Sequence, residues 1–474
     1  MNKQIMADIC VIGGGSGGLS VAAGAAQMGA TTVLIEANKM GGDCLNTGCV
    51  PSKALIAAGH AAEIVRSAGE FGVNGHEPEI RFKDVHGHVH GVIGAIAPHD
   101  SVERFERLGC TVIQARARFV APDVVEAGGF AIRARRFVVS TGSRAVVPPV
   151  PGLRESPHFT NETIFDNTAA PEHLIVIGAG PIGLEMAQAH RRLGARVTVL
   201  DLGPILPNDD PELTAVVRKA LIDEGVEIFE RIKVVKVERK GNGVAVTVAY
   251  DNDERVIQAS HIMVAAGRKP NVESLGLEAA GIEYSPKGIK VDARLRTTNK
   301  KVFAIGDVAG GLQFTHVAAY HAGIVIRNAL FRLPAKVNYA AVPWVTYTDP
   351  ELAHVGLTEK QARDRHGEVR VLRFPYAEND RAQAERRTAG QAKVVVTPKG
   401  AILGASLVGL HAGELLQPWV LAIAQKLKIG AMAQMIAPYP TLSEINKRVA
   451  GSFYTPTLFS DRTRKVVRFL GMFG

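Results

Sequence analysis

The chain has 474 residues, 46% hydrophobic and 21% charged, a composition that excludes a disordered or fibrous protein and a length that predicts about three domains. It contains no run of about 18 apolar residues and begins without the hydrophobic region of a signal peptide, so we expect a cytoplasmic protein with no transmembrane helix. The net charge is +9, but the basic residues are scattered, which argues against a nucleic-acid partner.

The first segment predicts a nucleotide-binding βαβ unit. An apolar run of strand length, residues 7–12, leads into the G-x-G-x-x-G fingerprint of Gly13, Gly15 and Gly18. An alanine-rich helical pattern follows, and a second apolar run ends at Glu36. The glycines let the backbone approach a pyrophosphate at a helix N-terminus, and the carboxylate can accept hydrogen bonds from a ribose.

Two cysteines lie in a glycine-rich loop directly after this unit. Cys44 and Cys49 are separated by four residues, and Lys53 follows them. So short a loop can close a disulfide at low entropic cost. A cysteine at the start of a helix and near a lysine should have a depressed pKa and be reactive. On spacing alone, two buried cysteines in a glycine-rich turn remain the alternative interpretation.

The same βαβ arrangement occurs a second time. An apolar run leads into Gly178, Gly180 and Gly183, and a second run ends at Asp201. The acid lies the same number of residues after the third glycine in both copies. Two fingerprints predict two dinucleotide sites, and a doubly wound sheet without a ligand is the alternative.

The sequence around the second unit indicates that the first domain is split. Residues 148–152 are rich in proline, which cannot continue a helix or a central strand, so they indicate a linker. After the second unit, an apolar run from Val302 ends in Gly306 and Asp307. This places a carboxylate at the C-terminal end of a strand, where ligands bind in open α/β sheets.

Residues 41–53 resemble the redox-active disulfide segment of the flavin disulfide reductases, which include dihydrolipoamide dehydrogenase, glutathione reductase and mercuric reductase. Residues 344–359 resemble the opening of that family's interface domain, and the resemblance runs from about residue 5 to 450. It implies an α/β fold with two Rossmann-like dinucleotide-binding domains, the second inserted in the first, and a C-terminal α+β dimerisation domain. The implied parts are an FAD-binding domain (1–150 and 271–340), an NAD-binding domain (151–270) and the interface domain of a homodimer (341–474).

The resemblance also implies roles for individual residues. Cys49 is the thiolate nearer the flavin, and Cys44 is the interchange thiol that attacks the substrate. Lys53 lies near the flavin and pairs with Glu185, because a cation there stabilises the anionic reduced flavin. The implied FAD-binding residues are Gly13, Gly15, Ser16, Gly18, Glu36, Gly42, Lys53, Ala117, Thr141, Gly142, Gly306, Asp307, Thr315, His316 and Ala318. The implied NAD-binding residues are Gly178, Gly180, Ile182, Gly183, Asp201, Val234, Gly267 and Arg268.

One position departs from the family pattern. Dihydrolipoamide dehydrogenases and glutathione reductases carry a histidine that serves as the base for the interchange thiol, with a glutamate five positions later to orient it. Here the glutamate is Glu444, and the histidine is replaced by Tyr439. A phenol with a pKa of about 10 is a poor base at neutral pH but can donate a proton or a hydrogen bond. Tyrosine here resembles mercuric reductases, yet no cysteine follows Cys110 to form their metal-capturing pair, and we expect no N-terminal metal-binding domain.

Substrate and coenzyme preferences follow from a few positions. Ala23 and Gly24 stand where glutathione reductases place arginines, which favours lipoyl groups or uncharged disulfides. Asp201, with no arginine in residues 202–208, favours NADH over NADPH. We therefore expect an FAD-dependent, NADH-linked oxidoreductase, similar to dihydrolipoamide dehydrogenase, that acts on a small disulfide or dithiol or on a lipoyl-bearing protein. A mercuric reductase-like enzyme and a non-catalytic partner protein are the alternatives.

Two segments lie outside these roles. His86, His88 and His90 suggest a metal ion, but a solvated helix face is the better interpretation and we predict no metal site. Residues 460–473 predict an amphipathic helix capped by Ser460 or Asp461. Its apolar side either packs on the interface domain or docks weakly on an anionic membrane or an acidic partner.

Overall fold

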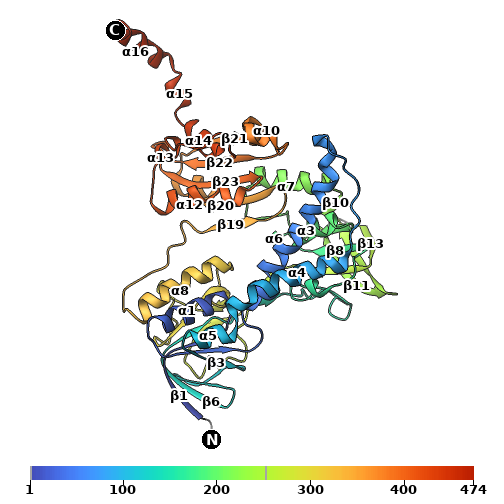
Figure 1. Ribbon diagram of the computed structural model, residues 1–474, viewed down its shortest axis with the longest axis vertical. Helices are drawn as coiled ribbons and strands as arrows, with labels where there is room; N and C mark the ends of the chain where they lie inside the picture. The colour runs from blue at the N-terminus through green and yellow to red at the C-terminus, as the bar shows by residue number, and fades with distance from the viewer. Residues whose placement is uncertain (1–2, 251–252, 474) are drawn as a thin grey trace. The chain divides into compact units, whose positions relative to one another are not determined.

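The computed structural model describes residues 3–250 and 253–473. By its internal contacts the chain divides into two compact units. Figure 1 shows the ribbon of the chain, coloured by residue number. Unit 1 comprises Met1–Leu202 and Glu227–Val337, and unit 2 comprises Gly203–Val226 and Asn338–Gly474. The elements form a mixed α/β fold, which confirms the fold class expected from the sequence.

The largest sheet of unit 1 has the strand order β3-β2-β1-β6-β5-β4, with β18 paired to β6. Strands β1, β2, β3, β6 and β18 run parallel, whereas β4 and β5 form an antiparallel extension. Because β18 returns to β6 from far along the chain, the intervening segment is an insertion. The strands are β1 (Lys3–Ile12), β2 (Thr32–Glu36), β3 (Cys110–Gln114), β4 (Arg118–Ala121), β5 (Val124–Ala127), β6 (Phe130–Val139) and β18 (Val302–Ala304).

Side chains of β1 alternate between two cores, as the two-residue period of a strand requires. Ile9 and Val11 face the core that contains helices α1 (Ser16–Gln27) and α8 (Thr315–Ala329). Cys10 and Ile12 face the core on the other side of the sheet. Burial of both faces explains why this strand is a continuous apolar run. Further helices of this part are α2 (Gly42–Asn46), α3 (Cys49–Ser67), α4 (Phe82–Ile96) and α5 (Val102–Arg107).

The inserted segment repeats the same design on a smaller scale. Its four-stranded sheet has the order β10-β9-β8-β14, and β8 pairs in parallel with both β9 and β14. A three-stranded antiparallel sheet, β11-β12-β13, accompanies it, and β7 pairs with β15 at the junction with the first sheet. The elements are β7 (Ser143–Ala145), β8 (His173–Ile177), α6 (Pro181–Arg192), β9 (Arg196–Leu200), β10 (Val226–Phe229), β11 (Lys233–Lys240), β12 (Gly243–Tyr250), β13 (Asp253–Ala259), β14 (His261–Val264) and β15 (Arg268–Pro270).

Unit 2 is built on a five-stranded antiparallel sheet with the order β19-β20-β23-β22-β21. Helices α11, α12, α13 and α14 contribute to its apolar core, in which Trp419 is fully buried and donates a hydrogen bond to Asn446 over 2.7 Å. The elements are β19 (Pro343–Thr346), β20 (Glu351–Gly356), α9 (Glu359–His366), β21 (Arg370–Pro375), α10 (Asp380–Ala384), β22 (Gln391–Val396), β23 (Ile402–Gly409), α11 (Ala412–Leu415), α12 (Gln417–Ala424), α13 (Ile429–Ala433) and α14 (Glu444–Gly451).

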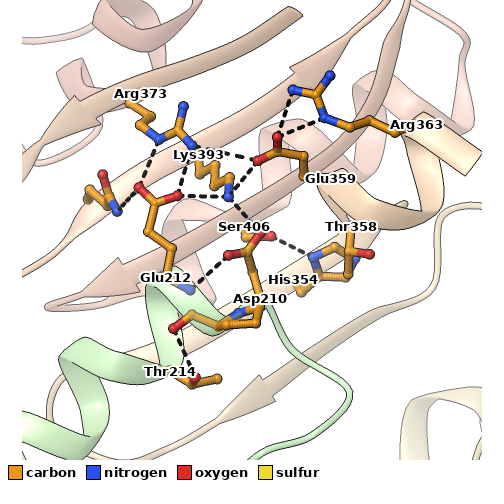
Figure 2. A network of polar contacts seen from close by, with 12 residues as sticks. Asp210, Glu212, Thr214, His354, Thr358, Glu359, Arg363, Arg373, Lys393 and Ser406 are labelled. Carbon is orange, nitrogen blue, oxygen red and sulfur yellow. Dashed lines mark hydrogen bonds and ion pairs between the residues drawn. The ribbon is translucent and has the colours of Figure 1, made fainter. Parts of the chain in front are cut away.

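A buried lysine ties helix α7 (Pro211–Asp223) to this sheet. Figure 2 shows Lys393 of β22 surrounded by carboxylates, with its Nζ 2.7 Å from Asp210, 2.8 Å from Glu212 and 2.8 Å from Glu359. Hydrogen bonds from Arg373, Lys393 and Gln391 hold the pKa of Glu212 well below its usual value. Burial alone would lower the pKa of Lys393, but its hydrogen bonds to the carboxylates raise it, so the ammonium stays charged. This network explains why residues 203–226 group with unit 2.

The last helices, α15 (Thr455–Leu458) and α16 (Asp461–Leu470), contain no buried residue. The helix predicted from about Arg462 is present, and Ser460 caps it by accepting a hydrogen bond from the Thr463 N–H over 3.2 Å. The prediction that its apolar side packs on the interface domain of the same chain is wrong, because the side chains of Val467 and Leu470 are 62% and 60% exposed.

Candidate functional site

The first glycine fingerprint forms an open cradle at the N-terminus of α1. Gly13 has φ +109°, and a Cβ there would lie 2.4 Å from the carbonyl oxygen of Ser140. A Cβ on Gly18 would lie 1.9 Å from the carbonyl oxygen of Gly13, so helix and strand approach too closely for a side chain. Gly15 is the N-cap residue, without a side-chain cap, and only the Gly42 Cα lies within 4 Å of its Cβ position. The N–H groups of the first helical turn are therefore available to an anion.

The acid at the end of β2 closes one side of this cradle. Glu36 accepts hydrogen bonds from the Gly14 N–H over 2.5 Å and from the Asn38 N–H over 2.7 Å, one on each oxygen. Each carboxylate oxygen keeps a further lone pair for a ribose hydroxyl. Ser16 begins α1, and Gly42 of the cysteine loop approaches Gly15 so closely that a Cβ on Gly42 would lie 2.7 Å from the Gly15 Cα.

The second fingerprint has nearly the same geometry. Gly178 has φ +113°, and a Cβ there would lie 2.4 Å from the carbonyl oxygen of Ala265. A Cβ on Gly183 would lie 1.9 Å from the carbonyl oxygen of Gly178, and no atom lies within 4 Å of the Cβ position of Gly180. Asp201 accepts a hydrogen bond from the Ala179 N–H over 2.6 Å, as Glu36 does in the first copy. Both cradles fit a dinucleotide pyrophosphate.

The two cysteines lie together at the start of α3. Cys44 comes from α2 and Cys49 begins α3, and both are thiols joined by a hydrogen bond. The Sγ of Cys49 is 3.3 Å from the Oγ1 of Thr315, the first residue of α8. The structure thus places the predicted redox pair against a residue that the sequence assigned to the flavin.

The two sulfurs differ in their protonation. The hydrogen bond from Cys44, together with that of Thr315 and the charge of Lys53, lowers the pKa of Cys49 to about 6 against the opposing effect of burial. The same hydrogen bond to Cys49, together with burial, raises the pKa of Cys44 far above its usual value. These shifts favour the thiolate on Cys49 and the proton on Cys44.

An ion pair stands beside the cysteine helix. The Nζ of Lys53 in α3 is 2.7 Å from a carboxylate oxygen of Glu185 in α6. The side chain of Glu185 is only 5% exposed, which excludes the alternative of a solvated helix residue. A buried carboxylate needs such a partner, and the pairing fixes the position of the lysine next to the cysteines.

A polar cluster that the sequence did not predict supports the cysteine loop. Asp43, the residue before Cys44, is 2.9 Å from the guanidinium of Arg268 and accepts a hydrogen bond from Asn161 over 3.1 Å. Arg268 also donates to the Ser143 hydroxyl over 2.8 Å, and Ser143 donates to Asp307 over 2.5 Å. Burial raises the pKa of Asp307 despite that hydrogen bond. The cluster joins residues assigned separately to FAD and to NAD.

The remaining nucleotide-binding candidates lie in several different elements of unit 1. Gly306 has φ +66° and donates its N–H to Nδ1 of His321 over 3.1 Å. Burial lowers the pKa of His321 to about 4, so its ring is neutral and can accept this bond. His321 was missed because a single histidine in a helix carries no distinctive pattern. Other candidates are Ala117 and Ala318, both buried; Thr141, which bonds Asn271; Gly142 and Gly267, both at positive φ; His316, stacked on Phe314; Ile182, partly exposed in α6; and Val234, at a bulge in β11.

Tyr439 and Glu444 lie in unit 2. Tyr439 is 70% exposed, and its hydroxyl donates a hydrogen bond to Asp380 over 2.9 Å. That hydrogen bond, the charge of Asp380 and the charge of Glu444 raise the pKa of the phenol, so Tyr439 is a proton donor at neutral pH. Asn379, next to Asp380, donates to the Thr441 carbonyl over 3.1 Å and so holds the loop that carries Tyr439.

The three histidines lie in α4, as expected. The rings of His86 and His90 are 4.2 Å apart, and the Nε2 of His90 is 3.1 Å from the carbonyl oxygen of Phe165. Within residues 3–250 and 253–473, no group of three or more histidine, cysteine or acidic side chains has the arrangement of a metal site. In the same part of the chain, no helix has both the length and the apolar character needed to cross a bilayer.

Comparison with known proteins agrees with this geometry. Residues 7–322 match the family model of pyridine nucleotide-disulphide oxidoreductases, and residues 342–450 match the dimerisation domain of that family. A mercuric reductase of Bacillus cereus is 34% identical over 440 residues, which cover 92% of this chain and 70% of the relative. A dihydrolipoyl dehydrogenase of Geobacillus stearothermophilus is 34% identical over 461 residues, which cover 94% of this chain and 96% of the relative.

Solved structures give the same result. The crystal structure of LpdA from Mycobacterium tuberculosis aligns with a TM-score of 0.86 at 28% identity, over 94% of this chain and 99% of that chain. A Cu(II) complex of the HOCl-induced flavoprotein disulfide reductase RclA from Escherichia coli aligns with a TM-score of 0.85 at 26% identity, over 94% and 99% of the two chains. The fold expected from the sequence is therefore confirmed by the fold of known flavoprotein disulfide reductases.

Proposed function

Because the chain belongs to the pyridine nucleotide-disulphide oxidoreductase family, we propose that it transfers electrons from NADH to a disulfide substrate through Cys44 and Cys49. The observation that carries this proposal is the placement of the two cysteines at the start of α3, with the Sγ of Cys49 3.3 Å from Thr315 and with Lys53, paired with Glu185 over 2.7 Å, on the same helix. We infer a homodimer from the dimerisation domain, in which Tyr439 and Glu444 serve the partner subunit's cysteine pair.

The first cradle would hold FAD, with the pyrophosphate at Gly15, the ribose at Glu36 and the ribityl chain at Asp307. The second would hold NADH through Gly180 and Asp201. When bound, a flavin would supply two-electron chemistry between the nicotinamide and the disulfide of the cysteine pair. Lys53, fixed by Glu185 at 2.7 Å, supplies a positive charge beside the cysteines and lowers the pKa of Cys49.

The two reduced cysteines then act in sequence on the substrate. Cys44 passes its proton to the Cys49 thiolate across their hydrogen bond and attacks one sulfur of the substrate; the substrate S–S bond breaks, a mixed disulfide forms, and the departing substrate sulfur takes up that proton. Cys49 as a thiolate attacks the Cys44 sulfur, which releases the second substrate thiol and restores the Cys44–Cys49 disulfide. Each turnover oxidises one NADH and reduces one disulfide to two thiols. Tyr439 can protonate the second leaving thiolate, because its phenol stays protonated at neutral pH.

A second candidate is reduction of a soft metal ion. The observation that favours it is the engaged hydroxyl of Tyr439, because metal reduction by thiolates requires no base at that position. Several of the similar proteins are mercuric reductases. The sequence gives less support to this candidate, since no cysteine occurs after Cys110 to transfer the metal.

A steady-state screen with NADH as the reductant separates these functions. We expect NADH oxidation with lipoamide or a small uncharged disulfide and little with glutathione disulfide, because Ala23 and Gly24 offer no positive charge to its carboxylates. Cys110→Ser is the matched control, since Cys110 is buried away from the pair and should leave the rate unchanged. Turnover with Hg(II) alone would support the second candidate. No turnover with any of these oxidants would favour a non-catalytic partner protein.

The coenzyme preference is a separate prediction. NADH should exceed NADPH in kcat/KM by at least about tenfold, because a 2′-phosphate placed near Asp201 is repelled and no cation in residues 202–208 binds it. Leu202→Arg should reduce the ratio of kcat/KM for NADH to kcat/KM for NADPH, because it places a cation directly after Asp201 at a position that is 75% exposed. Leu333→Arg, at another exposed position of unit 1, is the control and should leave the ratio unchanged. An equal or inverted ratio in the wild type contradicts the prediction.

A further inference from the structure

Helix α16 presents an apolar face that none of the described residues of its own chain covers. Val466, Phe469 and Leu470 recur at the spacing of one helix face. Phe473 lies just beyond the end of the helix at Leu470, and its ring contacts that of Phe469 with centroids 5.2 Å apart. These residues are 49%, 57%, 60% and 74% exposed. No residue of α16, coloured red in Figure 1, is buried. So many exposed large apolar side chains on one short helix mark an interaction surface.

The opposite face of the same helix is basic. On a helical projection Arg464 and Arg468 lie opposite the apolar residues, Lys465 lies at the border beside Phe469, and Arg462 lies in line with the apolar residues at the start of the helix. Asp461 is the single acid in residues 452–474. Arg464 pairs weakly with Asp461 over 3.6 Å. Within the described residues, Lys465 and Arg468 make no ion pair, so their charges are available to an external anion. A helix with lysine and arginine on one side and phenylalanine, leucine and valine on the other has the composition of an interfacial helix.

We propose that α16 docks on an anionic membrane surface, lying in the plane of the interface with its apolar face among the acyl chains. Charge argues against a second copy of this chain as the occupant, because it carries the same net charge of +9 and offers a basic helix little attraction. The apolar surface also continues beyond the helix at both ends, with Phe459 before it and Met472 after it, 68% and 73% exposed. Such a bulky apolar surface suits a fluid interface.

The helix is short, so a single copy should bind weakly and in a salt-dependent manner. Two helices in the homodimer, which rests on the proposed function, would bind the same vesicle together and strengthen the attachment. The enzyme would then work at a membrane surface without crossing it.

Cosedimentation of the full chain with vesicles tests this proposal. We expect binding to vesicles of equal parts phosphatidylglycerol and phosphatidylcholine, no binding to phosphatidylcholine alone, and release at about 0.5 M NaCl. Lys465→Glu/Arg468→Glu should weaken binding by tenfold or more, because it reverses the charge next to the lipid headgroups. Phe469→Ser/Leu470→Ser should weaken it to a similar extent by removing the buried apolar area.

The matched control is Lys360→Glu/Arg365→Glu, which changes the net charge equally at two exposed positions of α9 and should bind as the wild type does. Failure of the wild type to bind, or equal binding to both kinds of vesicle, overturns the proposal, as does an equal loss of binding in the control. A change of oligomeric state in the α16 variants also overturns it, because the helix would then pack on a second copy. All variants should keep the wild-type NADH oxidation rate with disulfide substrates, so loss of catalysis and loss of membrane binding can be told apart.

Discussion

Replacing Cys49 with serine should abolish the long-wavelength absorption band of the two-electron-reduced enzyme, whereas Cys44→Ser should show that band without any added reductant. The band requires a thiolate beside the flavin, and Cys49 has a pKa lowered to about 6 by its hydrogen bond from Cys44, by Thr315 and by Lys53. In Cys44→Ser no disulfide can form, and the serine hydroxyl keeps the hydrogen bond, so the thiolate persists in the oxidised enzyme. In both variants the rate of disulfide reduction should fall by at least about 10³-fold.

The pH dependence of this band follows from the same pKa. A lowered pKa means that the thiolate predominates above it, so the band should be full at neutral pH and fade as the pH falls through about 6. Absorbance titration of the reduced wild type and of Cys44→Ser measures this directly, with Cys110→Ser as the unaffected control. A wild-type enzyme that bleaches directly on reduction, with no intermediate band at any pH, would show that the cysteine pair is not redox-active.

Oxidation of dihydrolipoamide by NAD⁺ should be slow at pH 7, rise as the pH increases, and gain about 10²–10⁴-fold in Tyr439→His. Oxidising a dithiol requires a group that removes a thiol proton. The hydrogen bond of Tyr439 to Asp380, 2.9 Å long, raises the pKa of the phenol, so it stays protonated at neutral pH and cannot serve as that base. A histidine titrates near neutral pH and can accept the proton.

Tyr439→Phe is the matched variant for this prediction. It removes the hydroxyl while keeping the ring, and it should leave the slow oxidation rate at pH 7 unchanged, because no functioning base is lost. In the reductive direction the same variant should be slower, since the proton donor is gone. A wild-type oxidation rate at pH 7 equal to that of Tyr439→His would mean that another group serves as the base.

The sequence by itself determined the two nucleotide folds, because their requirements are local. A glycine at positive φ, a helix N-terminus without a side-chain cap and an acid at the end of the next strand all follow one another along the chain. The structure accordingly repeats the close approaches of 2.4 and 1.9 Å in both copies. The cysteine pair could also be predicted from the sequence, because both thiols and Lys53 lie within one short segment.

Only the tertiary structure decided which distant side chains meet. Asp380 contacts Tyr439 across 59 residues of sequence, and Arg268 reaches Asp43 through the packing of separate elements. Such pairs leave no periodic signal in the sequence, because each partner is an ordinary polar residue until the fold brings them together. The exposure of α16 is of the same kind: its amphipathic pattern predicts an apolar face, but whether the rest of the chain covers that face depends on where the helix lies, and here none of its residues is buried.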